Sequence, residues 1–399
     1  MKRESRGLGG KGGLLVIALL ALLLAAAICV PASAQAETIY LKGNSDGTAG
    51  GNDRNDGRTP GTAVLTLQKA MELAGEGGTI MVAKGVSLTM DITIENVTIQ
   101  REANYEGDLF AIGSVNNTPT VTLKNATIDG GNFKVVDESF DYASLFLING
   151  GTLKIEEGAV LQNNWSTAVV VSNGSLEMSG GEICYNKADG NYGSAVHLQN
   201  DSGTQTFTMT GGSIHDNEQK QYCGTVSVGG KNAVFTMEGG MITNNETGYG
   251  GGVQIGMGEA YLKGGTISNN QSTSSGGGVY LWTSVLEQPA CYLSGTEIIA
   301  NSAPRGAGIY VAGGELYITG GSIEKNTSTS AGAGIYAYSG SSYGNNTINI
   351  SGGTIQDNVV SNPKYGGAIA IYSADTSAQT ALSLSGSPVI GGNIYNIWQ

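Results

Sequence analysis

One short phrase recurs seven times between Gly180 and Asn358, and it constrains the fold more than any other part of the chain. Each copy begins with Gly-Gly (Gly-Thr in the fifth copy), with Ile three residues after the first Gly and Asn six residues after it. The isoleucines are Ile183, Ile214, Ile242, Ile267, Ile298, Ile323 and Ile355, and the asparagines are Asn186, Asn217, Asn245, Asn270, Asn301, Asn326 and Asn358. A looser copy has Gly158, Leu161 and Asn164. Recurrence at intervals of roughly 30 residues is typical of solenoids and propellers.

Each repeat also contains two further apolar segments. Two apolar residues with one residue between them precede the Gly pair, as in Leu176 and Met178. After the Asn and a turn of variable length comes a Gly-rich strand, written GGGVYL in one copy and GAGIYV in another. Alternation at period two indicates a strand with one buried face. Short strands of this kind are not stable alone, but stacking successive turns in register would bury every apolar column in one core.

The pattern therefore predicts an all-β, single-stranded parallel β-helix with three short strands per turn and about 11 to 12 turns. In such a fold the Asn column forms a ladder in which each amide hydrogen-bonds to the next. The Gly pair forms a tight corner that requires positive φ or a close approach of two backbones. A β-propeller is the alternative, but its blades are usually longer and the chain has no Trp-Asp signature.

These phrases resemble the repeats of the pectate-lyase-like right-handed parallel β-helix superfamily. They are also similar to the repeats of bacterial polymorphic outer-membrane proteins and other β-helical surface adhesins, which usually have Phe where this chain has Ile or Leu. The resemblance covers most of residues 37–392, and it implies a right-handed coil closed by an N-terminal capping helix. It implies no single activity, because such helices serve lyases, hydrolases, epimerases, adhesins and passive scaffolds.

Four segments are expected along the chain. Residues 1–34 combine basic side chains, an apolar run over residues 14–30 and small residues at the end, which is typical of a secretory signal peptide. An uncleaved anchor is the alternative, because a run of this length barely spans a bilayer. Residues 35–78 form an N-terminal cap with an amphipathic helix over residues 64–74, and residues 79–392 form the β-helix. Residues 393–399 are the C-terminal end, which either folds over the last turn or marks a truncation.

The charge of the chain excludes several partners. Residues 1–34 contain 4 of the 20 basic and 1 of the 33 acidic residues, so the mature chain has 16 and 32 and a net charge of −16. Such a surface repels nucleic acid and anionic membranes, and polyanionic glycans as well unless a basic patch or bound cations intervene. We expect a secreted or cell-surface bacterial protein with no nucleic-acid partner and no membrane insertion of the mature chain.

Three cysteines remain after the signal peptide. Cys291 falls on an inward position of the repeat, so we expect a buried thiol there. Cys184 and Cys223 belong to adjacent repeats and could pair in an oxidising compartment.

A loop rich in Gly, Asn and Asp follows the first expected strand. Asp46, Asp53, Asn55 and Asp56 place oxygen atoms at high density there, as a calcium site requires. Turn formation is the alternative interpretation, because these residue types favour turns for backbone reasons. No Glu closes the loop in an EF-hand pattern. We expect no obligatory cofactor, and calcium binding and turn formation both remain as interpretations of this loop.

The sequence contains no evident catalytic constellation. A lyase of the resembled superfamily would require a basic residue and carboxylates on neighbouring turns that hold calcium. The outward columns beside the repeated Ile have no two carboxylates on adjacent turns, and the Gly-His-Gly pattern of the family's hydrolases is missing. Glu182 and His215 are expected to approach one another diagonally as surface neighbours. Other acidic candidates, interpreted as solvated, are Asp129, Asp137, Glu138, Asp141, Glu156 and Glu157.

Two outward aromatic columns are the best candidates for ligand binding. They consist of Tyr280, Tyr310 and Tyr336 on the Gly-rich strand, with Trp282 beside them, and of Tyr261, Tyr292 and Tyr317 on the strand before the Gly pair. Aromatic side chains in a row can bind sugar rings or a protein partner. Sheet stabilisation by like residues on neighbouring strands is the alternative.

The sequence favours a non-catalytic β-helix that acts in adhesion or glycan binding, with a polysaccharide, or a host or cell-surface glycan or protein, as partner. A polysaccharide-active enzyme, in particular a lyase, is the first alternative, and it rests on the resemblance alone. A structural module of a larger envelope protein is the second.

Overall fold

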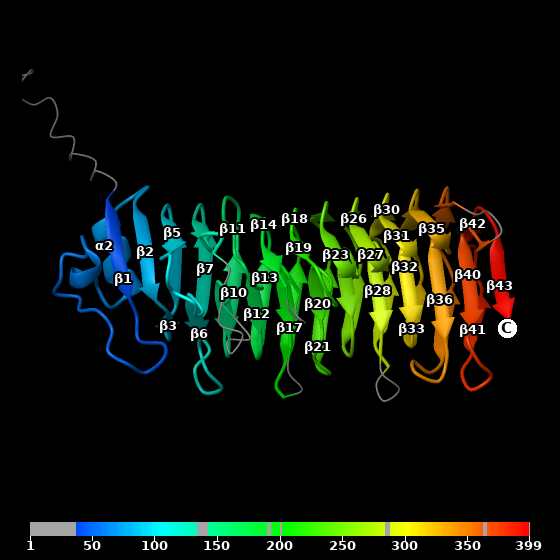
Figure 1. The fold of residues 1–399 in the computed structure, drawn as a ribbon, viewed down its shortest axis with the longest axis horizontal. Helices are drawn as coiled ribbons and strands as arrows, with labels where there is room; N and C mark the ends of the chain where they lie inside the picture. Colours follow the sequence, from blue (N-terminus) through cyan, green and yellow to red (C-terminus); the bar gives the residue numbers. More distant parts are fainter. Residues whose placement is uncertain are drawn as a thin grey trace, which may run out of the picture.

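The computed structural model describes residues 37–133, 143–189, 193–199, 202–283, 288–361 and 365–398. The expected signal peptide lies outside these residues, as do the acidic candidates Asp137, Glu138 and Asp141. The described chain forms an elongated rod of stacked parallel strands, with β1 and β43 toward opposite ends (Figure 1). The predicted all-β parallel β-helix is confirmed.

Three long parallel sheets run along the rod. The 13-strand sheet consists, in spatial order, of β1 (Thr38–Lys42), β2 (Thr79–Lys84), β5 (Thr98–Arg101), β8 (Thr127–Asp129), β11 (Val160–Gln162), β14 (Glu182–Cys184), β18 (Ser213–His215), β22 (Met241–Thr243), β26 (Thr266–Ser268), β30 (Glu297–Ile299), β34 (Ser322–Glu324), β38 (Thr354–Gln356) and β42 (Val389–Ile390). The 12-strand sheet consists of β3 (Val86–Leu88), β6 (Phe110–Ile112), β9 (Phe146–Ile148), β12 (Val169–Val171), β16 (Val196–Leu198), β20 (Val226–Val228), β24 (Val253–Ile255), β28 (Val279–Trp282), β32 (Ile309–Ala312), β36 (Ile335–Ser339), β40 (Ile369–Ser373) and β43 (Ile394–Trp398). The 11-strand sheet consists of β4 (Ile92–Glu95), β7 (Thr120–Lys124), β10 (Thr152–Ile155), β13 (Gly174–Met178), β17 (Gln205–Met209), β21 (Ala233–Met237), β25 (Glu259–Leu262), β29 (Ala290–Leu293), β33 (Gly314–Ile318), β37 (Asn346–Ile350) and β41 (Thr380–Leu384). These strand counts are close to the expected 11 to 12 turns.

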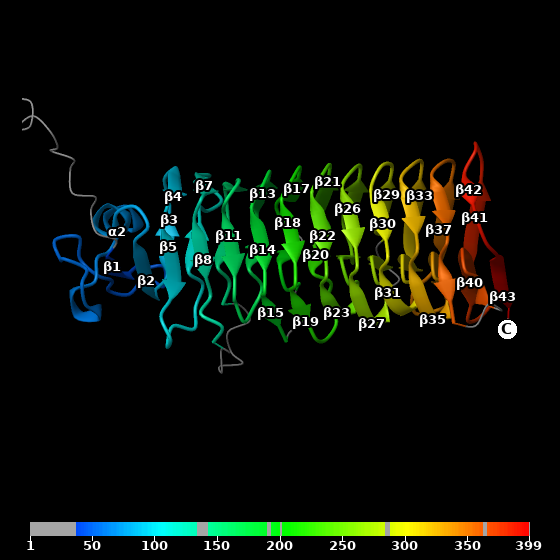
Figure 2. The ribbon, with the colours of Figure 1, turned by 90° about the horizontal axis from the view of Figure 1, so that it is seen from above.

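A fourth sheet was not predicted from the three apolar blocks of the repeat. Its strands are β15 (Lys187–Ala188), β19 (Glu218–Gln219), β23 (Glu246–Tyr249), β27 (Gln271–Ser275), β31 (Ser302–Arg305), β35 (Thr327–Ala331) and β39 (Val359–Val360). They lie beside one another along one edge of the rod (Figure 2). The turns from Lys187 to Val360 therefore have four strands, because the segment of variable length after each Asn is itself extended and paired.

The repeated Ile and its neighbours form one continuous core. Ile214 pairs in register with Ile183 on one side and Ile242 on the other, and all three are fully buried. On the 11-strand sheet Phe207 stacks on Phe235 with ring centroids 4.9 Å apart. Each inward column thus repeats at the strand spacing, which buries apolar side chains that a single turn would leave exposed.

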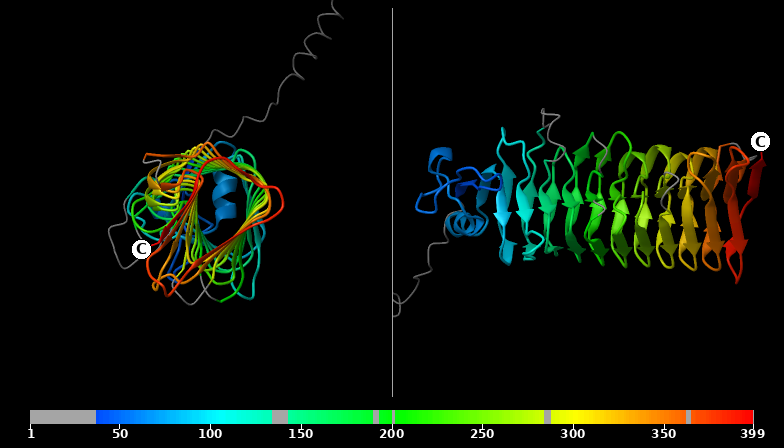
Figure 3. Two further views of the ribbon diagram at one scale, coloured as in Figure 1. Left: turned by 90° about the vertical axis from the view of Figure 1, so that its right-hand side faces the viewer. Right: turned by 90° about the horizontal axis from the view of Figure 1, so that it is seen from below.

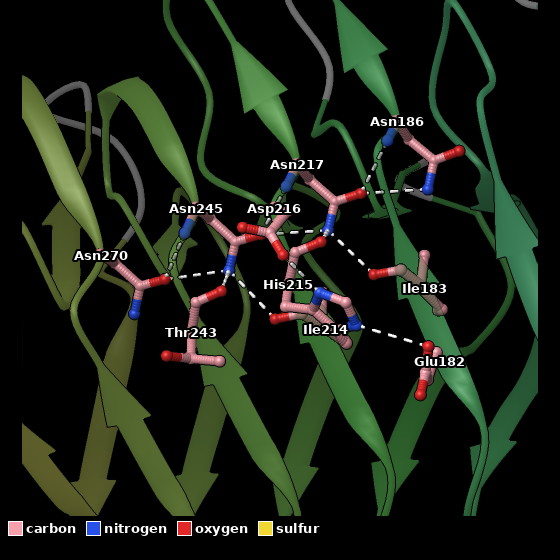
Figure 4. Close-up of polar contacts among 10 residues, drawn as sticks. All are labelled: Glu182, Ile183, Asn186, Ile214, His215, Asp216, Asn217, Thr243, Asn245 and Asn270. Atoms are coloured by element: carbon pink, nitrogen blue, oxygen red, sulfur yellow. Dashed lines mark hydrogen bonds and ion pairs between the residues drawn. The ribbon is translucent and has the colours of Figure 1, made fainter. Parts of the chain in front are cut away.

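The predicted asparagine ladder is present, and Figure 4 shows four of its members. Asn217 donates from its backbone N and from Nδ2 to Oδ1 of Asn245, at 3.0 Å each. Asn245 donates in the same way to Asn270, at 3.1 and 2.9 Å. Nδ2 also reaches a backbone carbonyl of the preceding turn, such as Ile214 O for Asn245. These bonds satisfy polar groups that the tight corner removes from water.

Two backbone conformations form the corners on either side of the repeated Ile. The second glycine of the Gly pair has positive φ, as at Gly212 (φ 79°), where an added Cβ would lie 2.5 Å from the carbonyl oxygen of Gly180. The residue before each ladder Asn is also left-handed, as at Asp216 (φ 53°) and Asn244 (φ 56°). The Gly pair is therefore a corner, as predicted, and a second corner precedes the Asn.

The cap at the N-terminal end consists of η1 (Pro60–Thr62) and the helix α2 (Leu67–Ala74). The helix was expected over residues 64–74 but begins later, because Thr66 is its N-cap and accepts from Lys69 N at 3.2 Å. Leu67, Ala70 and Ala74 are buried in the main core. Viewed along the rod, the helix lies within the outline of the coil (Figure 3). It thereby covers apolar residues at this end, as predicted.

The C-terminal strand continues the coil rather than folding over its end. β43 pairs in register with β40, Ile394 beside Ile369 and Tyr395 beside Ala370. The 12-strand sheet therefore extends beyond residue 392, where the sequence pattern placed the end of the helix.

Candidate functional site

The first tyrosine column is stacked as expected, but it is buried. Tyr280, Tyr310 and Tyr336 occupy equivalent positions of β28, β32 and β36, with successive ring centroids 5.2 and 5.3 Å apart. Their exposed fractions are only 6%, 7% and 5%. They form a second small core outside the main one, with Ala331 of the fourth sheet and Ala370 of β40. The expectation of an exposed stacking platform is therefore wrong for these three rings.

A glycine corner explains why these outward rings are covered. After β27, β31 and β35 the chain turns at Gly276, Gly306 and Gly332, and each of these glycines lies against the tyrosine of the strand that follows it. Gly306 has φ 57°, and a Cβ added there would lie 2.8 Å from Cβ of Tyr310. Only glycine allows this approach, so the Gly-rich start of the strand closes the second core. Burial raises the pKa of Tyr336 to about 12 and also raises the pKa values of Tyr280 and Tyr310, so their hydroxyls stay neutral.

A groove opens at one end of this column, and we call it the aromatic groove. Its volume is about 420 Å³. It is lined by Tyr222, Cys223, Tyr249, Gln254, Tyr280, Trp282 and Tyr343. Tyr222 and Trp282 are 61% and 38% exposed, whereas Tyr280 is nearly buried. The ring of Tyr249 lies between those of Tyr222 and Tyr280, with centroids 6.3 and 5.4 Å apart.

Gln254 is the polar group of the aromatic groove. Its Oε1 accepts from Gly224 N at 2.9 Å and its Nε2 donates to the carbonyl of Tyr222 at 3.1 Å. These bonds fix the amide, and each atom retains capacity for one further hydrogen bond. Cys223 is buried, and burial raises the pKa of its thiol to about 12, so it is no nucleophile at neutral pH.

The aromatic groove joins two predicted residues to several that the sequence did not reveal. Tyr280 and Trp282 were candidates from their place beside the Gly-rich strand. Tyr222, Tyr249 and Tyr343 were missed because they lie in segments whose length varies between repeats, so they form no column in the sequence. Spacing alone does not show which of them meet.

The second tyrosine column is half-exposed and stacks on itself. Tyr261, Tyr292 and Tyr317 have successive centroids 4.8 and 5.1 Å apart and interplanar angles of 7° and 6°. The hydroxyl of Tyr261 donates to Glu259 Oε2 and that of Tyr317 to Glu315 Oε2, both at 2.7 Å. Because each ring covers the face of its neighbour, the middle ring presents an edge to solvent. The arrangement therefore supports sheet stabilisation more than sugar stacking.

The calcium candidates do not converge on one point. Asp53 accepts from Leu65 N at 2.8 Å and Thr66 N at 2.9 Å, so it caps the entry to α2. Asp46 lies 2.7 Å from Lys84 Nζ, and hydrogen bonds from Lys84 and then Thr48 lower its pKa to about 2. Asn55 donates to Ala63 O at 3.0 Å, and Asp56 Oδ1 accepts from Arg58 N at 3.2 Å. The contact of Asp56 with Arg58 is local to a turn, whereas Asp46, Asp53 and Asn55 join the loop to other parts of the chain.

One group of side chains in the described part of the chain has the spacing of metal ligands. A ligand atom from each of Glu182, Cys184 and His215 lies within 4.8 Å of the other two. His215 Nε2 lies 3.6 Å from Glu182 Oε2, so the expected diagonal approach of these residues is confirmed (Figure 4). Burial, and then the nearby carboxylates, raise the pKa of the Cys184 thiol to about 12. Cys184, Cys223 and Cys291 are buried and none of these three is part of a disulfide, so the pairing considered for the first two is absent.

Comparisons with models of known protein families, with curated proteins and with solved structures found no match to this chain. Among the residues that the structure describes, no helix combines the length and apolar character needed to cross a membrane.

Proposed function

We propose that this protein binds uncharged glycans at the bacterial cell exterior through the aromatic groove, without cleaving them. The observation that carries the proposal is the lining of the groove, which combines four tyrosines and a tryptophan with one amide and includes no charged side chain among the residues that the structure describes. A sugar ring has an apolar C–H face and a rim of hydroxyl groups. Aromatic rings beside a few fixed hydrogen-bonding groups match both features.

The exposed rings and the fixed amide have complementary roles in this proposal. Trp282 and Tyr222 present accessible aromatic surface, on which a sugar face can stack. Gln254 is held by two backbone contacts, so its remaining lone pair and N–H meet a sugar hydroxyl without reorganisation. Rigid aromatic side chains lose little conformational entropy on binding, which favours affinity.

Charge supports an uncharged ligand over a uronate polymer. The chain carries a net charge of −13, and within the described part of the chain no Lys or Arg lines the groove to offset the repulsion of an anionic polysaccharide. The enzyme alternative, a lyase, acts on uronates and requires basic groups or a cation at the substrate. The described lining residues of the aromatic groove include no basic side chain and no carboxylate that could hold a cation.

The test is binding of the purified mature chain to a panel of neutral and anionic polysaccharides, by affinity electrophoresis and by titration calorimetry. We expect neutral glycans to bind, and Trp282→Ala to weaken binding about tenfold or more, the equivalent of about 1.4 kcal/mol. Tyr292→Ser, in the self-stacked column, is the matched control and should leave affinity unchanged. Equal affinity of the wild type and Trp282→Ala would overturn the groove as the binding site.

The same panel separates the other candidate functions. Release of unsaturated or reducing products from any polysaccharide would contradict a non-catalytic role and favour the enzyme. Absence of binding to every glycan would favour a structural module or a protein partner. Each polysaccharide is tested with and without calcium, so a cation-dependent ligand is also detected.

The proposal also includes export of the protein, membership of a structural superfamily and the handedness of the coil. Residues 1–34 are proposed as a cleaved signal peptide, supported by their basic start and apolar middle. Membership of the pectate-lyase-like superfamily and a right-handed coil are supported by the buried asparagine ladder and by the helix α2 at the N-terminal end. Mass spectrometry of the exported chain would show whether residues 1–34 are removed.

A further inference from the structure

A second polar cluster lies on the outer face of the 13-strand sheet, away from the aromatic groove. Cys184 of β14 and His215 of β18 are register partners on adjacent strands, and Glu182 lies two residues before Cys184 on the same face. The side chain of Glu182 is 53% exposed and that of His215 is 19% exposed, whereas Cys184 is buried. The cluster thus has a closed side at the thiol and an open side at the carboxylate.

Asp216 orients the imidazole of His215. Its Oδ2 lies 2.7 Å from Nδ1 of His215, on the side of the ring opposite to the cluster. A proton on Nδ1 that is donated to Asp216 leaves the lone pair of Nε2 directed toward Glu182, at 3.6 Å (Figure 4). Metal-binding histidines are typically held by such a carboxylate on the second ring nitrogen, which fixes both the tautomer and the ring orientation.

The backbone explains why these groups face one another. Asp216 occupies the left-handed corner that precedes the ladder residue Asn217, so its position is fixed by the turn. His215 and Cys184 are separated only by the spacing of two hydrogen-bonded strands. Tyr185 packs edge-on against His215 with ring centroids 5.9 Å apart, which restricts rotation of the imidazole. The cluster is therefore built on paired strands and a fixed corner.

We propose that Glu182, Cys184 and His215 bind a divalent transition-metal ion of the zinc class, with Asp216 as the positioning residue for His215. A thiolate and an imidazole are ligands that such ions prefer, whereas calcium prefers oxygen ligands alone. Three protein ligands leave a fourth position of a tetrahedron open on the exposed side. Binding of the metal displaces the thiol proton of Cys184 into solvent, and the charges then balance, because a dication offsets the Glu182 carboxylate and the Cys184 thiolate.

Cobalt(II) is the probe for the test, because a thiolate on tetrahedral cobalt gives a near-ultraviolet charge-transfer band. We expect this band when the chain is titrated with cobalt at neutral pH, and we expect zinc to remove it by competition. Cys184→Ser should abolish the band. His215→Gln and Glu182→Gln should weaken binding at least tenfold, and Asp216→Asn between about ten- and a hundredfold.

The matched control is Cys223→Ser, because Cys223 is also a buried cysteine outside any disulfide but lies in the aromatic groove. This variant should retain the band with unchanged affinity. Circular dichroism of each variant shows that loss of the band is not loss of the fold. No band in the folded wild-type chain, or a band that survives Cys184→Ser, would overturn the proposal. Because the groove and the cluster share no residue, failure here leaves the glycan proposal unaffected.

Discussion

The guanidinium of Arg101 donates from Nη2 to Oδ1 of Asn164 at 3.2 Å, and this contact is where the asparagine ladder begins. In later turns the Oδ1 of each ladder Asn accepts from the ladder Asn of the preceding turn. In the turn that contains β8, Ile128 pairs with Leu161, so the position equivalent to Asn164 is Gly131, which has no side-chain amide. Arg101 reaches past this turn and supplies the missing donor, and it also bonds the carbonyls of Ala143 and Ser144.

Replacement of Arg101 should therefore destabilise the fold strongly. Arg101→Met removes the donor to Asn164 Oδ1 and the bonds of the guanidinium to backbone carbonyls, and Arg101 itself is only 2% exposed. We expect a loss of about 3 kcal/mol in the free energy of unfolding. The measurement is urea-induced unfolding followed by circular dichroism.

The control is Arg58→Met, because Arg58 is 64% exposed and makes one ion pair, with Glu37 at 3.0 Å. An exposed pair of this kind contributes under about 1 kcal/mol. Equal losses in the two variants would show that the contact with the ladder carries no special stability.

The ladder predicts a difference between its interior and its end. Asn245→Ala removes the acceptor of Asn217 and the donor to Ile214 O, and both of these hydrogen bonds are buried. Asn358 also accepts from Asn326, at 3.0 and 2.9 Å, and its Nδ2 donates to Ile323 O at 2.8 Å, but Asn358 is only half-buried, so water can replace part of these bonds. We expect Asn245→Ala to cost about 3 kcal/mol and Asn358→Ala about 1 kcal/mol in urea unfolding. Similar costs at both positions would contradict a cooperative ladder.

Much of this fold is predictable because alignment of the repeats shows which residue type recurs at each position of the turn. Ile214 and Asn217 recur at fixed offsets, and a residue that must pack against its own copy in the next turn keeps its type. The same reasoning placed the corner at the Gly pair, whereas the helix before the first turns was predicted from the helical spacing of its apolar residues. Glu182 and His215 were correctly expected to meet, because register follows from the aligned phrases.

The remaining features depend on segments that the repeat does not fix. The fourth sheet arises where the length after each Asn varies, so no periodic pattern marks it. That sheet and the corner at Gly306 bury Tyr310, which alternation alone places on an outward face. The reach of Arg101 across a whole turn, and the meeting of Tyr222 with Trp282 in the aromatic groove, are likewise tertiary contacts without a sequence signature.

Ala300 offers a stabilising substitution. It occupies the left-handed corner with φ 57°, where equivalent turns have Asn244 and Asn269 at φ 56° and 54°. A Cβ in this conformation is unfavourable, whereas Gly or Asn tolerates it. Ala300 is exposed, so Ala300→Gly loses no packing and should stabilise the protein by about 0.5 to 1 kcal/mol.

The control for this corner is Ala381→Gly, at an exposed position of β41 that has no positive φ. There glycine should destabilise by about 0.5 to 1 kcal/mol, because it adds entropy to the unfolded chain with no strain to relieve. Opposite signs of the change in unfolding temperature for Ala300→Gly and Ala381→Gly would confirm the strain at Ala300, and changes of the same sign would contradict it.

His197 should make the stability depend on pH between about 4 and 6.5. Burial lowers its pKa to about 4, whereas an unfolded histidine titrates near 6.5. Between these values the unfolded chain binds a proton that the folded chain excludes. The free energy of unfolding therefore falls as the pH falls, by up to about 1.4 kcal/mol per pH unit. His197→Gln removes this dependence. Carboxylates common to the wild type and His197→Gln cancel in the difference between the two proteins. The urea midpoints of the two proteins, measured from pH 7 to 4.5, should therefore converge as the pH falls. Parallel midpoint curves would show that His197 is protonated in the folded state.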